Sequence, residues 1–178
     1  TNVTLVSGSL SVQSGTFDMD NKTFSAQVLY THSGGSVINS QAAGKIEAHT
    51  TFNISSGSIS NIHFVGAGGT LTSTGGTITD MTLGSGGGNH TIAGTWTVTN
   101  LFVTHTNSNS LGSGTINLSG NLTRTDASNN GTFGNGTMNI IMNGTGAQTI
   151  THNSGTFQPV LVVNKSLGTL TLLTNVSH

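Results

Sequence analysis

Gly15-Thr16-Phe17 is the first of eight triplets in which glycine is followed by serine or threonine and then by a large apolar residue. The other seven are Gly35-Ser36-Val37, Gly57-Ser58-Ile59, Gly76-Thr77-Ile78, Gly94-Thr95-Trp96, Gly114-Thr115-Ile116, Gly136-Thr137-Met138 and Gly155-Thr156-Phe157. Their glycines recur at a mean spacing of about 20 residues, a period typical of a solenoid in which each repeat forms one coil.

A second set of similar triplets lies 5 to 7 residues before glycines of the first set. Its members are Gly8-Ser9-Leu10, Gly69-Thr70-Leu71 and Gly131-Thr132-Phe133. Between the glycines, apolar and polar residues alternate, which indicates short half-buried strands. We therefore predict an all-β fold: residues 1–178 form a single-domain right-handed parallel β-helix. We expect three short strands per coil, about 20 residues per coil and eight to nine coils. The right-handed form is expected because the strict hexapeptide repeat of the left-handed form is absent.

The alternation also assigns an inside and an outside to each triplet. The apolar residue is expected to point inward once per coil and to form a core ladder: Phe17, Val37, Ile59, Ile78, Trp96, Ile116, Met138 and Phe157. The residue before it is expected to point outward and to form a Thr/Ser ladder: Thr16, Ser36, Ser58, Thr77, Thr95, Thr115, Thr137 and Thr156.

Charged residues are scarce in this chain. Only 9 of its 178 residues are Asp, Glu, Lys or Arg, and the net charge is −1. Four scattered Lys and Arg residues cannot neutralise a phosphate backbone, so no nucleic-acid partner is predicted. No apolar run reaches the roughly 18 residues of a membrane helix, so no membrane span is predicted. The lack of cysteine excludes disulfides and thiolate metal sites.

Neither end of the chain has the pattern of a capping coil. A solenoid without caps exposes strand edges and core at its ends, which favours contact with a neighbour. We therefore predict one unit of a longer or end-to-end stacked array, a homo-oligomer or filament. Its end-to-end interface is expected to comprise Val3, Leu5, Leu170, Leu172, Leu173 and Val176.

No motif predicts catalysis, a metal or a cofactor. Asp18-Met19-Asp20-Asn21 offers oxygen ligands of the kind that calcium prefers, but it lacks the spacing of a known calcium loop, so we interpret it as an outward face and turn. Glu47, Asp80 and Asp126 are isolated in sequence, whereas glycosidases need paired carboxylates. The seven histidines are also scattered, and we expect them at the surface or in turns. The chain is therefore predicted not to be an enzyme, and a polysaccharide-cleaving β-helix is the least favoured alternative.

A second alternative is a binding module. Thr77-Ile78-Thr79 and Thr95-Trp96-Thr97 would each place two threonines on an outward face, as in proteins that bind a glycan or ice. The same position is occupied elsewhere by residues that interrupt such an array: Asp18, Ile38, Asn117, Asn139 and Gln158.

Three stretches carry a resemblance to a known group of proteins. They are Ser14-Gly15-Thr16-Phe17-Asp18-Met19-Asp20-Asn21-Lys22-Thr23-Phe24, Gly144-Thr145-Gly146-Ala147-Gln148-Thr149-Ile150-Thr151 and Thr156-Phe157-Gln158-Pro159-Val160-Leu161-Val162-Val163-Asn164-Lys165. In pattern they resemble the degenerate repeats of very large prokaryotic surface β-helix proteins, which include adhesins and autotransporter-like passengers. The resemblance implies an extracellular or cell-surface location and a structural or adhesive role, with a surface glycan as a possible partner.

Overall fold

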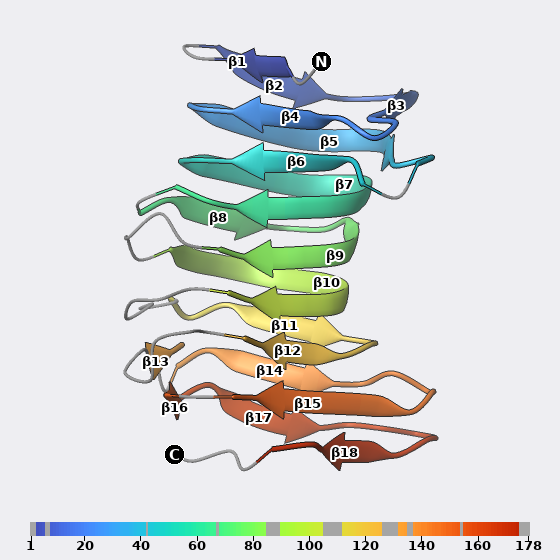
Figure 1. Ribbon diagram of the computed structural model, residues 1–178, viewed down its shortest axis with the longest axis vertical. Helices are drawn as coiled ribbons and strands as arrows, with labels where there is room; N and C mark the ends of the chain where they lie inside the picture. Colours follow the sequence, from blue (N-terminus) through green and yellow to red (C-terminus); the bar gives the residue numbers. More distant parts are fainter. Residues whose placement is uncertain are drawn as a thin grey trace.

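The computed structural model shows a β-solenoid whose coils stack along one axis (Figure 1). It describes residues 3–5, 8–41, 43–66, 68–84, 90–104, 112–125, 132–134, 137–153 and 155–174. These residues form strands and turns without a helix. The strands are β1 (Val3–Leu5), β2 (Ser9–Val12), β3 (Thr16–Asp18), β4 (Thr23–Ala26), β5 (Leu29–Ile38), β6 (Lys45–Ala48), β7 (Thr51–Phe64), β8 (Thr70–Ser73), β9 (Thr77–Leu83), β10 (Thr91–Val103), β11 (Thr115–Leu118), β12 (Leu122–Arg124), β13 (Thr132–Phe133), β14 (Asn139–Met142), β15 (Gln148–His152), β16 (Thr156–Phe157), β17 (Val160–Val163) and β18 (Leu170–Leu172).

Each coil has three sides, because the parallel pairings fall into three columns. Side A consists of β1, β4, β6, the ends of β7, β9 and β10, and then β12, β15 and β18. Side B contains β2, β8 and the beginnings of β5, β7 and β10. Side C contains β3, β11, β14, β17 and segments of β5, β7, β9 and β10.

The predicted parallel β-helix is confirmed, with coils of about 21 residues. It has about seven coils, fewer than the eight to nine expected. In the middle of the molecule the three short strands of a coil join into longer ones. Within β7, Phe52–Ile54 pairs on side B, Ser58–Ile59 on side C and Ile62–Phe64 on side A. A strand can pass a corner in this way where a glycine supplies the bend.

The predicted core ladder holds in register for its first four residues and then shifts. Phe17, Val37, Ile59 and Ile78 lie opposite one another in successive coils. Ile78, however, lies opposite Val98 and not opposite Trp96, so the prediction is wrong at this step. The reason is the length of the coil: the chain has to continue past Trp96 to Val98 before it completes the turn that began at Ile78.

Trp96 and Ile116 lie opposite each other as predicted, and two further departures from the ladder come after them. Trp96 lies opposite Ile116, and Ile116 lies opposite Ile140, so Met138 precedes the column. Phe157 belongs to a separate two-stranded sheet of β13 and β16, which carries the aromatic pair Phe133–Phe157. All four displaced residues, Trp96, Ile116, Met138 and Phe157, are nevertheless buried. A shift by an even number of residues keeps a side chain on the same face of a strand.

Aromatic rings from β5, β7 and β10 pack against one another in the core. Tyr30 and Phe52 stack with ring centroids 5.1 Å apart, and Phe52 stacks on Trp96 at 5.9 Å. Phe64 meets the edges of Phe52 at 5.1 Å and Trp96 at 6.4 Å. These offset and edge-to-face contacts link the sides of the coils across the interior.

Polar side chains are also buried, which corrects the expectation for the histidines. His32, His90 and His152 lie in the core, whereas His49 and His63 are half-buried; His105 and His178 lie outside the described residues. His32 points inward because it occupies the column of Val12 and Ile54 on side B. Its Nδ1 atom lies 3.2 Å from the hydroxyl oxygen of Tyr30, with which it shares a hydrogen bond.

The buried histidines predict that the protein loses stability in mild acid. Burial is the main cause of the lowered pKa of His32. Burial is also the main cause of the lowered pKa of His152, and the positive charge of Arg124 lowers it further. Below about pH 6.5, the ordinary pKa of histidine, the unfolded chain therefore binds more protons than the folded one. The stability is fully present above that pH and falls as the pH decreases toward the lowered folded pKa values.

Urea denaturation at a series of pH values between about 7.5 and 5 measures this effect, followed by the fluorescence of Trp96. The midpoint is expected to fall steadily over this range, which lies above the ordinary carboxylate pKa values. A variant with both His32→Gln and His152→Gln should start less stable but show a shallower decline. An equally steep decline in that variant would contradict the assignment to these two side chains.

Candidate functional site

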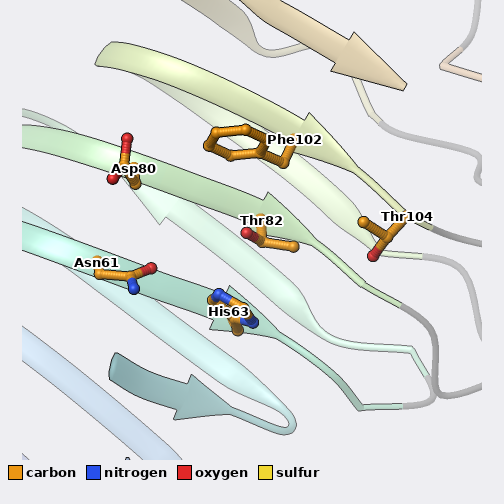
Figure 2. Close-up of a pocket in the computed structure, with 6 residues that line it drawn as sticks. All are labelled: Asn61, His63, Asp80, Thr82, Phe102 and Thr104. Atoms are coloured by element: carbon orange, nitrogen blue, oxygen red, sulfur yellow. The ribbon is translucent and has the colours of Figure 1, made fainter. Parts of the chain in front are cut away.

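A groove of about 300 Å³ lies on the outer face of side A (Figure 2). It crosses three successive coils, because its walls come from the ends of β7, β9 and β10. Its lining residues are Asn61, His63, Asp80, Thr82, Phe102 and Thr104. We refer to it as the side A groove.

Strand alternation places these side chains outside the core. On β9, for example, Met81 and Leu83 point into the core, so Asp80 and Thr82 point to the opposite side of the sheet. Two rows of outward residues result: Asn61, Asp80 and Asn100 form one row, and His63, Thr82 and Phe102 form the other. The groove therefore has one row of amides and a carboxylate beside one row with two rings.

The hollow exists because a small residue stands between two large ones. Thr82 lies directly between His63 and Phe102 in the stack of strands. Only 7% of Thr82 is exposed although its side chain points outward, because its larger neighbours shield it. Figure 2 shows the Phe102 ring and the His63 imidazole on opposite sides of Thr82, with Asp80 and Asn61 toward one end.

Hydrogen bonds hold the polar row in place. Asn100 donates from Nδ2 to Oδ1 of Asp80 over 2.9 Å. Asn61 donates from Nδ2 to the carbonyl oxygen of Gly44 over 3.2 Å. These contacts limit the rotation of both side chains, so their remaining polar atoms have a defined direction on the groove wall.

The charges around the groove make it slightly acidic. Lys45 and Glu47 on β6 form an ion pair of 2.9 Å next to His63, and Glu47 lies opposite His63 in the register. The pKa of His63 is lowered, mainly by burial and also by the positive charge of Lys45. The negative charges of Glu47 and Asp80 partly offset this by raising the pKa. The imidazole is therefore mostly neutral at pH 7, and Asp80 supplies the charge inside the groove.

No motif in the sequence marks this group of residues. Glu47 and Asp80 are isolated in sequence because they lie far apart in the chain, and Phe102 and His63 belong to no motif. His63, Thr82 and Phe102 nevertheless follow one another at intervals of one coil. A search for chemically rich positions one coil apart could have found them, since residues one period apart in a solenoid become neighbours.

The outward Thr/Ser ladder is in register over only part of its length. Thr16, Ser36, Ser58 and Thr77 lie opposite one another on side C. Thr95 pairs with Thr115 two residues out of this column, because Ile78 lies opposite Val98. Thr115 pairs with Asn139, and Thr156 pairs with Thr132 in the other sheet. Thr137 precedes β14. The ladder therefore does not form one continuous threonine surface.

Five of the six residues of the predicted end interface lie within the described part of the chain. Leu172 and Leu173 are 54% and 60% exposed, and Leu170 is half-buried. Val3 and Leu5 belong to β1, which pairs with β4 at the opposite end of the stack. Val176 lies outside the described residues.

Among the described residues, no group of three or more His, Asp or Glu side chains is arranged to hold a metal ion. Asp18 instead caps its turn: its Oδ1 accepts hydrogen bonds from the backbone amides of Asp20 at 2.8 Å and Ser40 at 3.2 Å. These hydrogen bonds lower the pKa of Asp18, and the bond from the Asp20 amide has the largest effect. The described part of the chain also contains no helix long and apolar enough to cross a membrane.

Comparison with known proteins gives no relative: no protein-family model, no curated protein and no solved structure matches the chain significantly. The resemblance to prokaryotic surface β-helix proteins therefore stays a prediction. Two features of the molecule itself bear on function, the side A groove and the apolar surface of the last coil.

Proposed function

We propose that this chain is a structural and adhesive element of an extracellular surface protein or fibre, and that copies stack end to end through their terminal coils. The observation that carries the proposal is the exposure of core positions in the last coil. Val163 continues the inward column of Met142, and Leu172 continues that of Ile150. Met142 and Ile150 are fully buried, whereas Val163 and Leu172 are 57% and 54% exposed.

The strand edges of this coil support the same interpretation. Within the described residues, β17 pairs only with β14, and β18 pairs only with β15. Each therefore has one edge whose backbone N–H and C=O groups face away from the stack. An added parallel strand would satisfy these groups and cover the apolar side chains at the same time.

The geometry of the stack favours a second copy of this chain as the occupant. The first described strand, β1, and the last one, β18, both lie on side A and run in the same direction (Figure 1). The leading coil of one copy can thus continue the sheet of another without a change of direction. Such a head-to-tail contact does not close on itself and produces a filament. A net charge of −1 leaves little electrostatic repulsion between copies.

The proposed role needs no catalytic group, and the resemblance of the repeats to those of prokaryotic surface β-helix proteins supports a location outside the cell. Serine, threonine, asparagine and glycine provide the polar surface in place of charges, which are only 5% of the residues. The parallel ladders and the packed interior make the rod stiff, so it can hold an adhesive surface away from its point of attachment.

Sedimentation velocity over a range of concentrations tests the end-to-end contact. The chain should form lengthwise oligomers, and electron microscopy should show them as thin filaments. A Val163→Asp, Leu172→Asp double variant should dissociate at least about tenfold more readily, because it would bury two unpaired charges in the contact. Val28→Asp is the matched control: Val28 is 46% exposed but lies in the turn after β4, so association should be unchanged.

Two results would contradict the proposal. One is a wild-type chain that stays monomeric at every concentration, in which case the apolar coil would be covered by something other than a second copy. The other is equal association of the double variant and the Val28→Asp control. Circular dichroism spectra of both variants show whether the solenoid itself is intact.

A further inference from the structure

The side A groove has the features of a binding site for a small, hydroxyl-rich ring. We propose that it binds a neutral pyranose of a carbohydrate, with Phe102 and His63 on either side of the sugar and Asp80 as the main hydrogen-bond acceptor. This inference does not depend on the end-to-end contact, because the groove lies on an outer face of the coils and not at the end of the rod.

The spacing of the two strands that carry these rings is compatible with one sugar ring between them. His63 and Phe102 are two strands apart, with Thr82 between them. Two strand spacings amount to about 9.5 Å. A ring held between two flat groups needs about 7–8 Å, since carbon atoms in contact lie about 3.5–4.0 Å apart. The remaining space accommodates the puckered shape of a pyranose, whose C–H groups pack well on an aromatic face.

The floor of the groove is suited to a ring with polar edges. Thr82 contributes a methyl and a hydroxyl group of small volume to the lining of the groove between the two larger side chains. Thr104 adds a second hydroxyl just beyond the end of β10. A pocket with an aromatic wall and a few fixed polar groups is the usual form of a small-molecule site, and about 300 Å³ is at the small end of their range.

The polar row selects for hydroxyl groups. Asp80 accepts one hydrogen bond from Asn100 at Oδ1, and an ionised carboxylate can accept several, so it can also receive sugar hydroxyls. Such bonds to an ionised acceptor are about twice as strong as neutral ones. Asn61, whose Nδ2 is directed to Gly44, stands one strand away and provides an amide beside the same hydroxyls.

The charge of the site excludes acidic ligands. Asp80 lies inside the groove, and Glu47 lies next to it on β6. The one described cation beside the groove, Lys45, is engaged with Glu47 at 2.9 Å. Phosphorylated, sulfated or uronic sugars would therefore be repelled, whereas a neutral hexose or N-acetylhexosamine would not.

Saturation-transfer NMR on the intact chain tests the proposal. The probes are the methyl glycosides of glucose, galactose, mannose and N-acetylglucosamine, with glucuronic acid as the acidic comparison. At least one neutral glycoside should show transfer, with a Kd on the order of 1 mM, and glucuronic acid should show none. Phe102→Ala and Asp80→Asn should each weaken binding about tenfold or more.

Asp20→Asn is the matched control for the carboxylate. It removes the same charge at an exposed turn outside the groove, where the positive φ of 54° also suits asparagine. Its binding should equal that of the wild type. Circular dichroism verifies that each variant is folded.

The proposal is overturned if no neutral glycoside binds, or if Phe102→Ala and Asp80→Asn bind as tightly as Asp20→Asn. Adenosine is a further probe. Its binding in place of the sugars, with loss in Phe102→Ala, would show that the groove accepts flat bases and that the sugar assignment is wrong. None of these results depends on whether copies of the chain stack, so failure here and failure of end-to-end association are separate outcomes.

Discussion

Replacing Gly57 with alanine is expected to lower the free energy of unfolding by roughly 2–5 kcal/mol. Two costs add at this corner between sides B and C. Gly57 has a φ of +84°, a conformation that costs other residues about 1–2 kcal/mol. An added Cβ would also lie 2.5 Å from the carbonyl oxygen of Gly35 and 2.5 Å from Nε2 of His32. One of these neighbours is backbone and the other is a buried ring, so neither can move without disturbing the preceding coil, to which both belong.

Two other glycines separate these costs. Gly15 has nearly the same φ, +76°, but an added Cβ would meet nothing within 4 Å. Gly15→Ala should therefore show only the conformational cost of about 1–2 kcal/mol. Gly146 has neither a close neighbour nor a positive φ, so Gly146→Ala should be neutral or slightly stabilising. Urea denaturation followed by circular dichroism measures all three.

The loss in the free energy of unfolding is expected to be largest for Gly57→Ala, smaller for Gly15→Ala and absent for Gly146→Ala. Equal losses at Gly57 and Gly15 would mean that the steric contact with the preceding coil contributes nothing. An unchanged midpoint for both would mean that the corner does not need glycine at all.

The fold could be predicted from the sequence because its signals are local. Gly15, Gly35 and Gly57 each turn the chain at the same corner with a positive φ, as do Gly76 and Gly94. A bend of this kind needs no information from distant parts of the chain. Strand alternation is equally local, and together the two signals specify a stack of three-sided coils.

The register could not be predicted throughout, because the coils differ in length. Along side A, the coil from Ile46 to its partner Ile62 is short, whereas the coil from Leu122 to its partner Ile150 is much longer. A single mean period averages over such differences. At this step the glycine triplets are only 18 residues apart, from Gly76 to Gly94, so the ladder placed Trp96 opposite Ile78, whereas the structure places Val98 there.

The side A groove was missed for a related reason. Its shape depends on which outward residues of three coils become neighbours, and this requires the register. Thr82 creates the hollow only because His63 and Phe102 flank it. The burial of His32 likewise follows from its column beside Val12 and Ile54, which the register alone identifies.

Replacing Trp96 with alanine is expected to destabilise the protein by about 3–5 kcal/mol, the usual cost of removing a buried tryptophan. Trp96 is 1% exposed, and its ring contacts Phe52 and Phe64, which lie on two different sides of the coil. Its Nε1 donates a hydrogen bond to the carbonyl oxygen of Ala93 over 3.0 Å, which the alanine variant also loses. The cavity cannot close easily, because the surrounding side chains are fixed to strands of successive coils.

Thr97→Ala is the matched control, since Thr97 is the next residue on β10 but is exposed; its effect should stay within about 0.5 kcal/mol. Thermal and urea denaturation followed by circular dichroism measure both variants, because the only tryptophan is absent from one of them. A Trp96→Phe variant should recover part of the loss by restoring the contact with Phe52. If Trp96→Ala were no more harmful than Thr97→Ala, the aromatic cluster would not be what joins the sides of these coils.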